Sequence, residues 1–406
     1  MTTWRTSTYH RHWLLRQADR LFDFFQYTSV NPKGGFFDLY DDGRPISALR
    51  QLHATTRMVH CFAIGHLLGR PGADALVDHG MDCIWNGHRD TRHGGYIWSF
   101  DDDGARDDSK QAYGHAFVLL AASSAKCIGH PLADKMLADV TEVLEQRFWE
   151  ASPGVTSEEY ARDWSKISDY RGQNSNMHLT EALMAAFEAT GDSEYLCKAE
   201  SIASFIIGKH AAALDYRVAE HFDASWNLFN DYRGSEIFRP AGSTPGHWLE
   251  WARLLLQLHE LGGRKLAWLQ QAAENLFRNS IALGWDHNKG GFFYTLEWDN
   301  TPRLRQKLWW PVTEGIGAAA WLAAHSSDPF FEVWYRRIWG FAANHLIDHA
   351  KGGWHAELDQ NLKPTRGFFM GKPDIYHALQ ACLIPLYPAE GSLTNMISGG
   401  SSASEA

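Results

Sequence analysis

The sequence contains few cysteines and no cysteine motif. Its five cysteines lie far apart, form no Cys-x-x-Cys pair and are odd in number. This pattern argues against a disulfide framework or a paired-cysteine zinc site, and it predicts reduced, buried thiols. The five residues are Cys61, Cys83, Cys127, Cys197 and Cys382.

Positive charge and long apolar runs are also scarce. The 38 Lys and Arg against 48 Asp and Glu give a formal net charge of -10, and no basic stripe could displace phosphate counterions from a nucleic acid. No window approaches the roughly 18 uncharged apolar residues of a membrane span. Residues 1–13 lack the apolar core of a signal peptide. We therefore expect a cytoplasmic protein without a nucleic-acid or membrane partner.

Aromatic residues, in contrast, are abundant. The 406 residues include 18 Trp, 14 Tyr and 22 Phe. Their flat surfaces suit a large core, and they also suit the apolar faces of sugar rings. Composition alone leaves both uses open.

A short turn element recurs along the whole chain. Its clearest copies read Lys-Gly-Gly-Phe-Phe at 33–37 and 289–293, and its weakest copy is Asp215-Tyr216-Arg217. Markers at positions 34, 94, 154, 215, 290 and 352 are separated by 60, 60, 61, 75 and 62 residues. A Gly pair followed by aromatic residues predicts a turn into a short strand or hairpin.

Between the markers the apolar residues follow helical spacing, and each repeat has room for two helices. Segments such as 132–148 and 267–281 are amphipathic, which predicts outer helices, while 117–122, 182–187, 254–258 and 317–324 are nearly all apolar, which predicts inner helices. Six such units predict an all-α (α/α)6 barrel with short β-hairpins at one end. The alternative is a two-domain helical protein whose Gly-Gly turns coincide by chance.

We assign residues 1–390 to this single catalytic domain. The 75-residue step contains an insertion around 227–244 that is rich in Gly, Pro and polar residues, which predicts a long loop over one end of the ring and a possible lid. The Ser/Gly-rich segment 391–406 is predicted to be a disordered tail.

Polar residues gather where each inner helix should begin. In a closed ring these helix starts converge on one mouth, where free N–H groups favour anionic intermediates. The set comprises His53, Arg57 and His60; Lys110, Tyr113 and His115; Asn176 and His178; His247 and Glu250; Trp309, Trp310 and Glu314; and Asp374, Tyr376 and His377. Each histidine alone could be a helix cap or a core residue, but a set drawn from all six units favours function.

The spacing within this set indicates acid–base chemistry. His247 and Glu250 are three residues apart on one helix face, so Glu250 could orient the imidazole as a general base. The sequence lacks a His-Glu-x-x-His motif, a phosphate-binding loop and a Gly-x-Ser-x-Gly elbow. We therefore expect metal-free proton transfer without a cofactor, with zinc bound by several histidines as the alternative.

Five motifs in order identify a family. They are Thr55-Thr56-Arg57-Met58, Asn176-Met177-His178, Thr244-Pro245-Gly246-His247 with Glu250, Trp310-Pro311 with Glu314, and Lys372-Pro373-Asp374-Ile375-Tyr376-His377. From about Trp13 to Pro388 the chain resembles the N-acylglucosamine 2-epimerase superfamily, and within it the aldose–ketose isomerases that act on mannose, lyxose or sulfoquinovose. The resemblance implies the (α/α)6 barrel that the repeat count predicts independently.

The resemblance also implies the roles of individual residues. His247 and His377 would be the acid–base pair, and Arg57, His178 and Glu250 would lie in the sugar site. The sulfoquinovose branch has Trp in place of His53 and Gln in place of Pro373. Both departures favour a neutral aldose such as D-mannose, while Arg239 in the 227–244 loop leaves an anionic sugar open.

The expected reaction moves a proton from C2 to C1 through an enediolate. A histidine with a pKa near about 6.5 can both take and return that proton. We assign this shuttle to His377 and ring opening to His247, oriented by Glu250, with Arg57 stabilising the enediolate oxygen. The remaining expected sugar contacts are His53, Tyr113, His178, Trp310, Glu314 and Asp374.

Three other readings stay open. Two bases on opposite faces of C2 would make a 2-epimerase. Two carboxylates among Glu250, Glu314 and Asp374 could instead flank a glycosidic bond, as in a glycoside hydrolase. A non-catalytic carbohydrate-binding ring is the third reading.

Overall fold

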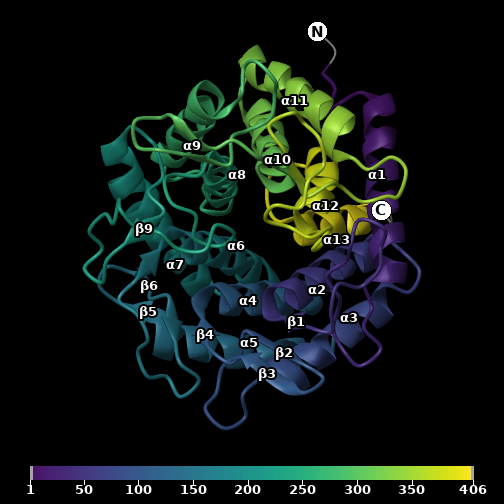
Figure 1. The fold of residues 1–406 in the computed structure, drawn as a ribbon, viewed down its shortest axis with the longest axis vertical. Helices are drawn as coiled ribbons and strands as arrows, with labels where there is room; N and C mark the ends of the chain where they lie inside the picture. Colours follow the sequence, from purple (N-terminus) through teal and green to yellow (C-terminus); the bar gives the residue numbers. More distant parts are fainter. Residues whose placement is uncertain (1–2, 404–406) are drawn as a thin grey trace.

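Twelve helices form a closed double ring around a central axis (Figure 1). The structure is a computed structural model that describes residues 3–403 and the side chains of residues 3–399. The inner ring consists of α2 (Leu52–Leu67), α4 (Ala112–Cys127), α6 (Gln173–Thr190), α8 (Pro245–Leu261), α10 (Trp309–His325) and α12 (Tyr376–Leu383). The outer ring consists of α1 (Thr8–Thr28), α3 (Ala73–Asp82), α5 (Ala133–Val143), α7 (Ser193–Ala203), α9 (Trp268–Asn279) and α11 (Pro329–Phe341).

Neighbouring inner helices pack on one another around the axis, and α12 closes the ring by packing on both α1 and α2. The fold is therefore the (α/α)6 barrel that the repeat predicts. In the inner helix α4, 14 of 16 residues are buried, because outer helices cover one side and the other inner helices cover the rest. In the outer helix α9, only residues on one face are buried, namely Leu269, Ala272, Ala273, Leu276 and Phe277.

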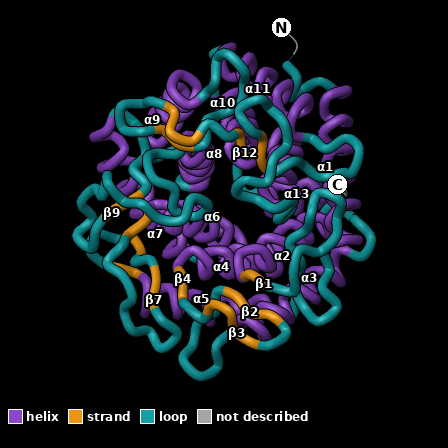
Figure 2. The backbone as a smooth tube through the Cα atoms, in the orientation of Figure 1, coloured by secondary structure: helices purple, strands orange, loops and turns teal. Residues whose placement is uncertain are grey.

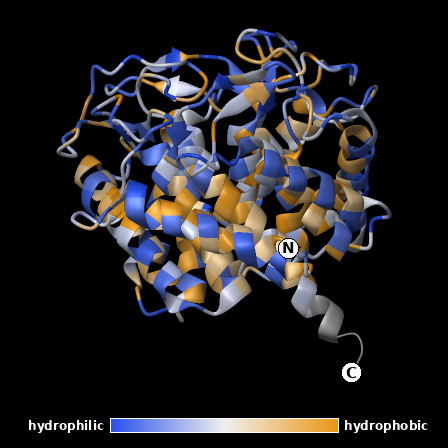
Figure 3. Cartoon of the chain, turned by 90° about the horizontal axis from the view of Figure 1, so that it is seen from below, coloured by the Kyte–Doolittle hydropathy of each residue, from blue (hydrophilic) through white to orange (hydrophobic). Residues whose placement is uncertain are grey.

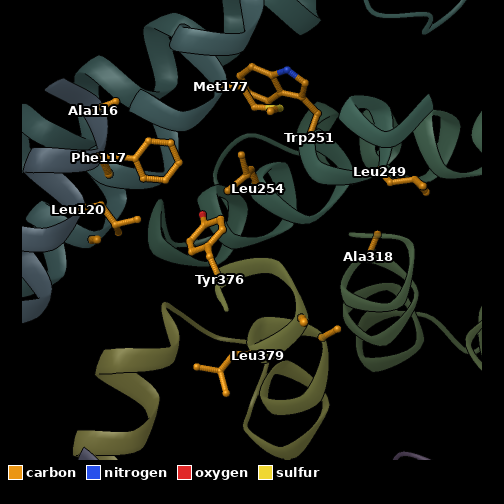
Figure 4. Close-up of a cluster of buried hydrophobic side chains, with 14 of the residues drawn as sticks. Ala116, Phe117, Leu120, Met177, Leu249, Trp251, Leu254, Ala318, Tyr376 and Leu379 are labelled. Atoms are coloured by element: carbon orange, nitrogen blue, oxygen red, sulfur yellow. The ribbon is translucent and has the colours of Figure 1, made fainter. Parts of the chain in front are cut away.

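The centre of the barrel is filled by large side chains from several inner helices. Figure 4 shows part of this core, where Phe117 of α4, Trp251 and Leu254 of α8, and Tyr376 of α12 point toward one another. Trp251 and Tyr376 are fully buried. This packing leaves open space only toward the two ends of the barrel, where the cavities described below lie.

The six marker residues all have backbone conformations that require a turn. Gly34, Gly94, Gly154, Gly290 and Gly352 have φ between 77° and 109°, and Asp215 has φ 52° in the unit without a Gly pair. Glycine adopts this left-handed conformation readily, and Asp adopts it at a lower energetic cost than most other residues. The weak fourth copy is therefore a true member of the repeat.

Short antiparallel strands lie at one end of the barrel, which we call the strand-bearing end (Figure 2). β1, β4, β8 and β12 each lie directly before an inner helix and pair with a strand of the following unit, which fixes where that helix starts. The strands are β1 (Arg50–Gln51), β2 (Ser99–Asp101), β3 (Gly104–Asp107), β4 (Lys110–Gln111), β5 (Trp149–Glu150), β6 (Val155–Thr156), β7 (Glu159–Tyr160), β8 (Arg171–Gly172), β9 (His221–Phe222), β10 (Thr295–Leu296), β11 (Pro302–Leu304), β12 (Lys307–Leu308) and β13 (Glu357–Leu358).

Buried lysines tie three of the marker turns to the adjacent inner helix. Each lysine is at most 1% exposed and forms an ion pair with the aspartate that begins the turn, at 2.8–3.1 Å. The pairs are Lys110–Asp90, Lys307–Asp286 and Lys372–Asp348. Lys110, which the sequence places among the polar groups at the mouth, therefore has a structural partner.

The C-terminal segment differs from its prediction. Where the sequence predicts disorder from residue 391 onward, the structure has helix α13 (Leu393–Ala403), which packs on α2 and α4 at the end of the barrel opposite the strands (Figure 3). The reason is that Glu188 of α6 accepts hydrogen bonds from Ser392 and Asn395 and so anchors the segment. Residues 404–406 of the predicted tail lie outside the described residues.

The predicted loop around 227–244 is irregular, as expected, and its residues Ile237 and Phe238 reach the mouth of the barrel. Within residues 3–403, no helix combines the length and apolar character that a membrane span requires.

Candidate active site

A cavity opens at the strand-bearing mouth and is lined from all six inner-helix starts. Nine of the eleven residues proposed from the sequence line it: His53, Arg57, Tyr113, His178, His247, Glu250, Trp310, Asp374 and His377. Residues that the sequence did not single out for the sugar site complete the wall, namely Asn174, Ile237, Phe238, Trp309, Phe369 and Pro373. The convergence predicted from the repeat is therefore present.

His247 is held by a carboxylate from the preceding loop. Its Nδ1 lies 2.8 Å from Oε2 of Glu220, and Glu220 also accepts a hydrogen bond from the side-chain amide of Gln173 at 2.8 Å. Trp251 donates to the oxygen of Gln173, which fixes the orientation of that amide. Nδ1 of His247 also lies 3.0 Å from Nε2 of Gln173, which donates to Glu220. Because the carboxylate only accepts, a neutral His247 that is hydrogen-bonded to Glu220 carries its proton on Nδ1 and leaves Nε2 as the basic nitrogen.

This pairing corrects the predicted partner of His247. Glu250 lies on the same helix three residues later, but the imidazole reaches across to Glu220 instead. Burial works to raise the pKa of Glu220, and the neighbouring His247 outweighs it and holds that pKa below its usual value. Glu220 is thus an ionised partner for the imidazole.

His377 has an equivalent arrangement on the other side of the cavity. Its Nδ1 lies 2.8 Å from Oε1 of Glu314, which again leaves Nε2 as the basic nitrogen. Glu314 was expected to bind the sugar, but it lies behind His377 and does not line the cavity. Burial works to raise the pKa of Glu314, and Arg253 together with His377 outweighs it and lowers that pKa.

The ring of Trp310 lies between the two histidines. Its centroid is 5.0 Å from that of His247 and 6.1 Å from that of His377. A Cβ on Gly246 would come within 2.4 Å of this ring, so the Gly that precedes His247 is required by the close approach. The indole therefore forms an apolar surface between two bases.

His178 lacks such a hydrogen-bonded carboxylate. Its Nδ1 is 3.6 Å from Oε1 of Glu250, and neither atom has a hydrogen-bond partner in the described structure. Burial lowers the pKa of His178 well below its usual value, assisted by the positive charge of Arg57. Burial, with the nearby charge of Glu314, raises the pKa of Glu250 well above its usual value. Both shifts favour the uncharged form of the pair.

Arg57 is the fixed cation of the cavity wall. It donates to Asp374 at 3.1 Å and to the hydroxyl of Tyr113 at 2.8 Å, and its guanidinium lies over the ring of Phe117 at 4.5 Å. Burial works to raise the pKa of Asp374, but Arg57 outweighs it and holds that pKa low. The guanidinium is thus held in place and its charge is balanced by Asp374.

Aromatic side chains cover the outer part of the cavity. His53 stacks on Trp98 with ring centroids 4.9 Å apart, and Phe238 of the 227–244 loop meets His53 edge-on at 5.5 Å. Burial, together with Arg57, lowers the pKa of His53 to about 3, so His53 is neutral. The loop therefore closes over the site with an apolar residue.

Arg239, the predicted anion-binding residue, is engaged elsewhere. It forms two hydrogen bonds with Glu159 at 3.1 and 2.8 Å, lies 3.6 Å from Glu158 and does not line the cavity. Its neighbour in sequence, Phe238, takes the place over the sugar site instead. Arg239 thus anchors the loop rather than binding the substrate.

One group of described residues has the spacing of a metal site. Ligand atoms of His178, Glu181 and Glu250 all lie within 4.8 Å of one another. The guanidinium of Arg253 already contacts this group, at 3.3 Å from Glu181 and 3.9 Å from Glu250. A metal ion would therefore meet a permanent cation, which makes this a poor metal site.

Sequence reasoning also missed Glu220, the partner of His247, and a positional signal could have found it. Residues four or five positions after a marker lie directly before a short strand, and their carbonyl oxygens accept from the first residues of an inner helix. This holds for Trp98, Glu158, Glu220 and Ala356, whose partners are the N–H groups of Leu52, Ala112, Gln173 and Trp309. Side chains at this repeated position therefore lie beside the mouth.

Fold and site together define an (α/α)6 barrel whose mouth holds a cavity with two carboxylate-paired histidines. The chain belongs to the N-acylglucosamine 2-epimerase (GlcNAc 2-epimerase) family, whose sequence profile matches residues 34–381.

Similarity to relatives extends over nearly the whole chain. The sequence is 42% identical over 405 residues to a D-mannose isomerase of Thermobifida fusca, covering 98% of this chain and 99% of that protein. It is 40% identical over 407 residues to a D-mannose isomerase of Pseudomonas cannabina pv. alisalensis, covering 98% of each. A crystal structure of D-mannose isomerase matches with a TM-score of 0.88 at 33% identity, over 92% of this chain and 97% of that one.

Proposed function

We propose that this protein is an aldose–ketose isomerase that interconverts D-mannose and D-fructose, with D-lyxose and D-xylulose as a second pair. The observation that carries the proposal is the pair of histidines, His247 and His377, which line one cavity and are each held through Nδ1 by a carboxylate at 2.8 Å. Similarity to D-mannose isomerases over 98% of the chain supports the choice of sugar.

The reaction requires an open-chain sugar, so ring opening comes first. His247 accepts the proton of the O1 hydroxyl and delivers it to O5 as the C1–O5 bond breaks and the C1=O1 bond forms. Nε2 of His377 then removes the proton from C2, and the electron pair forms a C1=C2 bond while O1 becomes an oxyanion. The proton returns to C1 and the O2 proton moves to O1, which gives the ketose. General acid–base catalysis of this kind contributes about 10²- to 10⁴-fold.

The enediolate oxygen needs a positive partner that is already in place. Arg57 meets this need because Asp374 and Tyr113 fix its guanidinium at the cavity wall. A preorganised donor of this kind loses little on reorganisation during the reaction. Trp310, between the two bases, offers the sugar an apolar face.

The charges of the cavity wall favour a neutral sugar. Among the described residues that line it, Arg57 is the only permanent cation, and Asp374 balances it. His53 is neutral, and Arg239 is paired with Glu159. A sulfonated sugar would bring a negative charge without a free cation to meet it, which argues against sulfoquinovose.

The carboxylates are badly placed for glycoside hydrolysis, which needs two of them beside the scissile bond. Glu314 lies behind His377, and Asp374 is bound to Arg57 and to the N–H of Tyr376. Of the two carboxyl groups among the described lining residues, only Glu250 is left without a hydrogen-bonded arginine. Epimerisation at C2 would use the same residues, and the product distinguishes it: D-glucose rather than D-fructose.

We further propose that the reaction needs no metal, since Arg253 already neutralises the one candidate ligand group. The test is to incubate the purified protein with D-mannose in deuterium oxide, with and without EDTA, and to follow the products by NMR. We expect D-fructose in both samples, with deuterium at C1 in the molecules for which the proton held by His377 exchanges with solvent before it returns. Absence of D-fructose would refute the proposed reaction, and loss of activity with EDTA that added zinc restores would refute metal independence.

A further inference from the structure

Below the floor of the sugar cavity lies one buried arginine that the proposed mechanism does not use. Arg253 of α8 is 3% exposed and does not line the sugar cavity. Its Nε donates to Oε2 of Glu314 at 3.2 Å, and its terminal nitrogens donate to Glu181 at 3.3 Å. The guanidinium therefore joins α8 to α10 and α6 directly beneath the catalytic residues.

Glu314 uses its two oxygens for two different partners. Oε2 accepts from Arg253 at 3.2 Å, and Oε1 holds Nδ1 of His377 at 2.8 Å. Arg253, Glu314 and His377 thus form a continuous chain of charge-assisted hydrogen bonds that ends at the cavity. Such buried hydrogen bonds to an ionised group orient the group at the end of the chain.

The opposite side of Arg253 faces a second cavity. This cavity lies toward the other end of the barrel, and the segment before and within α13 covers it. Its polar lining residues are His60, Glu181, Arg253, Gln257, Gln380 and Ser392. Arg253 thus separates two polar spaces, and among the described residues Glu314 has two ion-pair partners, the permanent cation Arg253 and His377 itself.

We propose that Arg253 is a positioning residue for the isomerisation, which acts through Glu314 to keep the ring of His377 oriented and its Nε2 unprotonated. This inference rests on the proposed function. Arg253 itself does not touch the sugar, because the cavity wall beside His377 is formed by other residues.

Arg253 can affect Glu314 selectively because its three glutamate neighbours lie at different distances. Glu314 lies at 3.2 Å and Glu181 at 3.3 Å, while Glu250 is the most distant at 3.9 Å. The other titratable or charged groups around this network are Arg57 and His60 on α2, His178 on α6, and Tyr376 and His377 on α12. Arg253 therefore stabilises the charge of Glu314 more than that of Glu250.

The effect of removing Arg253 on His377 follows from hydrogen-bond chemistry. An ionised Glu314 can only accept, so it requires a proton on Nδ1 of His377 and leaves Nε2 basic. Without the guanidinium, burial raises the pKa of Glu314, and a protonated Glu314 donates to Nδ1 instead. The proton of neutral His377 then sits on Nε2, which can no longer take a proton from C2.

The test compares Arg253→Met with Arg253→Lys over a range of pH. We expect Arg253→Met to lower kcat about 100-fold at pH 7 with KM changed less than about threefold, and to move the acidic limb of the kcat profile to higher pH. Arg253→Lys keeps the charge but cannot bridge Glu181 and Glu314 equally, so we expect a smaller loss with the acidic limb in place. An unchanged pH profile in Arg253→Met, or a loss confined to KM, would overturn the proposal.

A matched control is an arginine–carboxylate pair of the outer layer. Arg89 donates to Asp139 of the outer helix α5 at 3.0 Å, and neither residue lines the cavity. Arg89→Met should lower thermal stability without moving the pH profile. A profile shift in this variant as large as that of Arg253→Met would assign the shift to a general loss of stability and contradict the proposal.

A spectroscopic readout separates this inference from the proposed reaction. With imidazole ¹⁵N labelling, we expect neutral His377 to be protonated on Nδ1 in the wild type and on Nε2 in Arg253→Met. This result would support the role of Arg253 even if the protein converted no D-mannose, and an Nδ1-protonated ring in both proteins would refute it. If Arg253→Met does not fold, Arg253→Gln serves as the neutral variant. If neither variant folds, Arg253→Lys remains the test, and a kcat equal to that of the wild type would refute the proposal.

Discussion

Two His–Glu pairs at the mouth are alike, and a third differs. His247 with Glu220 and His377 with Glu314 both have Nδ1 at 2.8 Å from a carboxylate oxygen. His178 and Glu250 stand 3.6 Å apart without a hydrogen bond. In the first two pairs the pKa of the glutamate is lowered against the effect of burial, and in the third burial raises it.

The comparison shows that proximity of a histidine to a glutamate does not define an ionised dyad. All three pairs are buried, so each carboxylate needs donors to stay charged. Glu220 has the amide of Gln173 and the N–H of Thr244, and Glu314 has Arg253. Oε1 of Glu250 has no donor. The first two pairs can therefore orient a base, while in the third burial disfavours the charged form of both the carboxyl group and the imidazole.

The largest expected effect comes from removing either base. His247→Asn and His377→Asn should each lower kcat/KM by about 10²- to 10⁴-fold, but through different steps. With deuterium at C2 of D-mannose, the residual turnover of His377→Asn should show a full primary isotope effect, because C–H cleavage is slow. In His247→Asn ring opening is slow, so the isotope effect should fall toward one.

The control for these variants is a buried histidine outside the cavity. Nε2 of His115 accepts from the N–H of Tyr96, and its Nδ1 lies 2.7 Å from the carbonyl oxygen of Gln111. His115→Asn should cost stability and leave the isotope effect at its wild-type value. Equal isotope effects in His247→Asn and His377→Asn would show that the assignment of one step to each base is wrong.

A smaller effect is expected when only the orienting carboxylate loses its charge. In Glu314→Gln the donors of Arg253 attract the amide oxygen, so the amide NH₂ is turned toward Nδ1 of His377 and forces the wrong tautomer. We expect a loss in kcat of up to about 10²-fold with little change in KM. Glu220→Gln should lose less kcat. Gln173 and Thr244 donate to different oxygens of Glu220, so they do not force the amide oxygen of the glutamine into one position, and that oxygen can still face His247.

Steady-state kinetics on both variants, together with the tautomer of each histidine by ¹⁵N NMR, decides this point. A larger loss in Glu220→Gln than in Glu314→Gln would mean that the two pairs are not distinguished by Arg253. Wild-type activity in both would show that neither carboxylate orients a base.

The fold could be predicted from the sequence because its turns leave a chemical trace. A left-handed turn selects glycine, so five of the six marker positions are visible as glycine, and their spacing counts the units. Residues at equivalent places in the units then meet at one mouth, which is why nine site residues from 53 to 377 could be named in advance.

Side-chain partners could not be predicted in the same way. The spacing of His247 and Glu250 is correct for one helix face, but the carboxylate that holds the imidazole comes from a loop that the helix only meets in the folded ring. Arg239 was placed correctly in the loop, yet a partner from another unit, Glu159, removes its charge from the mouth. Such side-chain pairings depend on contacts between units, and no periodic pattern in a single sequence indicates which residues form them.

The smallest predicted effect concerns the protonation of the odd pair. Folding raises the pKa of Glu250 above its usual value of 4.5. Between pH 4.5 and the higher pKa of Glu250 in the folded state, the folded protein binds more protons than the unfolded one. Its stability therefore falls as the pH rises through this range. Glu250→Gln mimics the protonated acid and lacks this loss, so it should gain stability relative to the wild type with rising pH, by up to about 1.4 kcal/mol per pH unit.

Glu314→Gln should show the opposite sign, because folding lowers the pKa of Glu314 below its usual value of 4.5. The wild type is then favoured over Glu314→Gln at neutral pH, and the advantage disappears as the pH falls below that value toward the pKa of the folded state. Urea unfolding midpoints of the three proteins between about pH 3 and pH 9 measure both slopes. Parallel curves for the two variants would mean that Glu250 and Glu314 carry the same charge, and the distinction between the orienting pairs and the His178–Glu250 pair would fail.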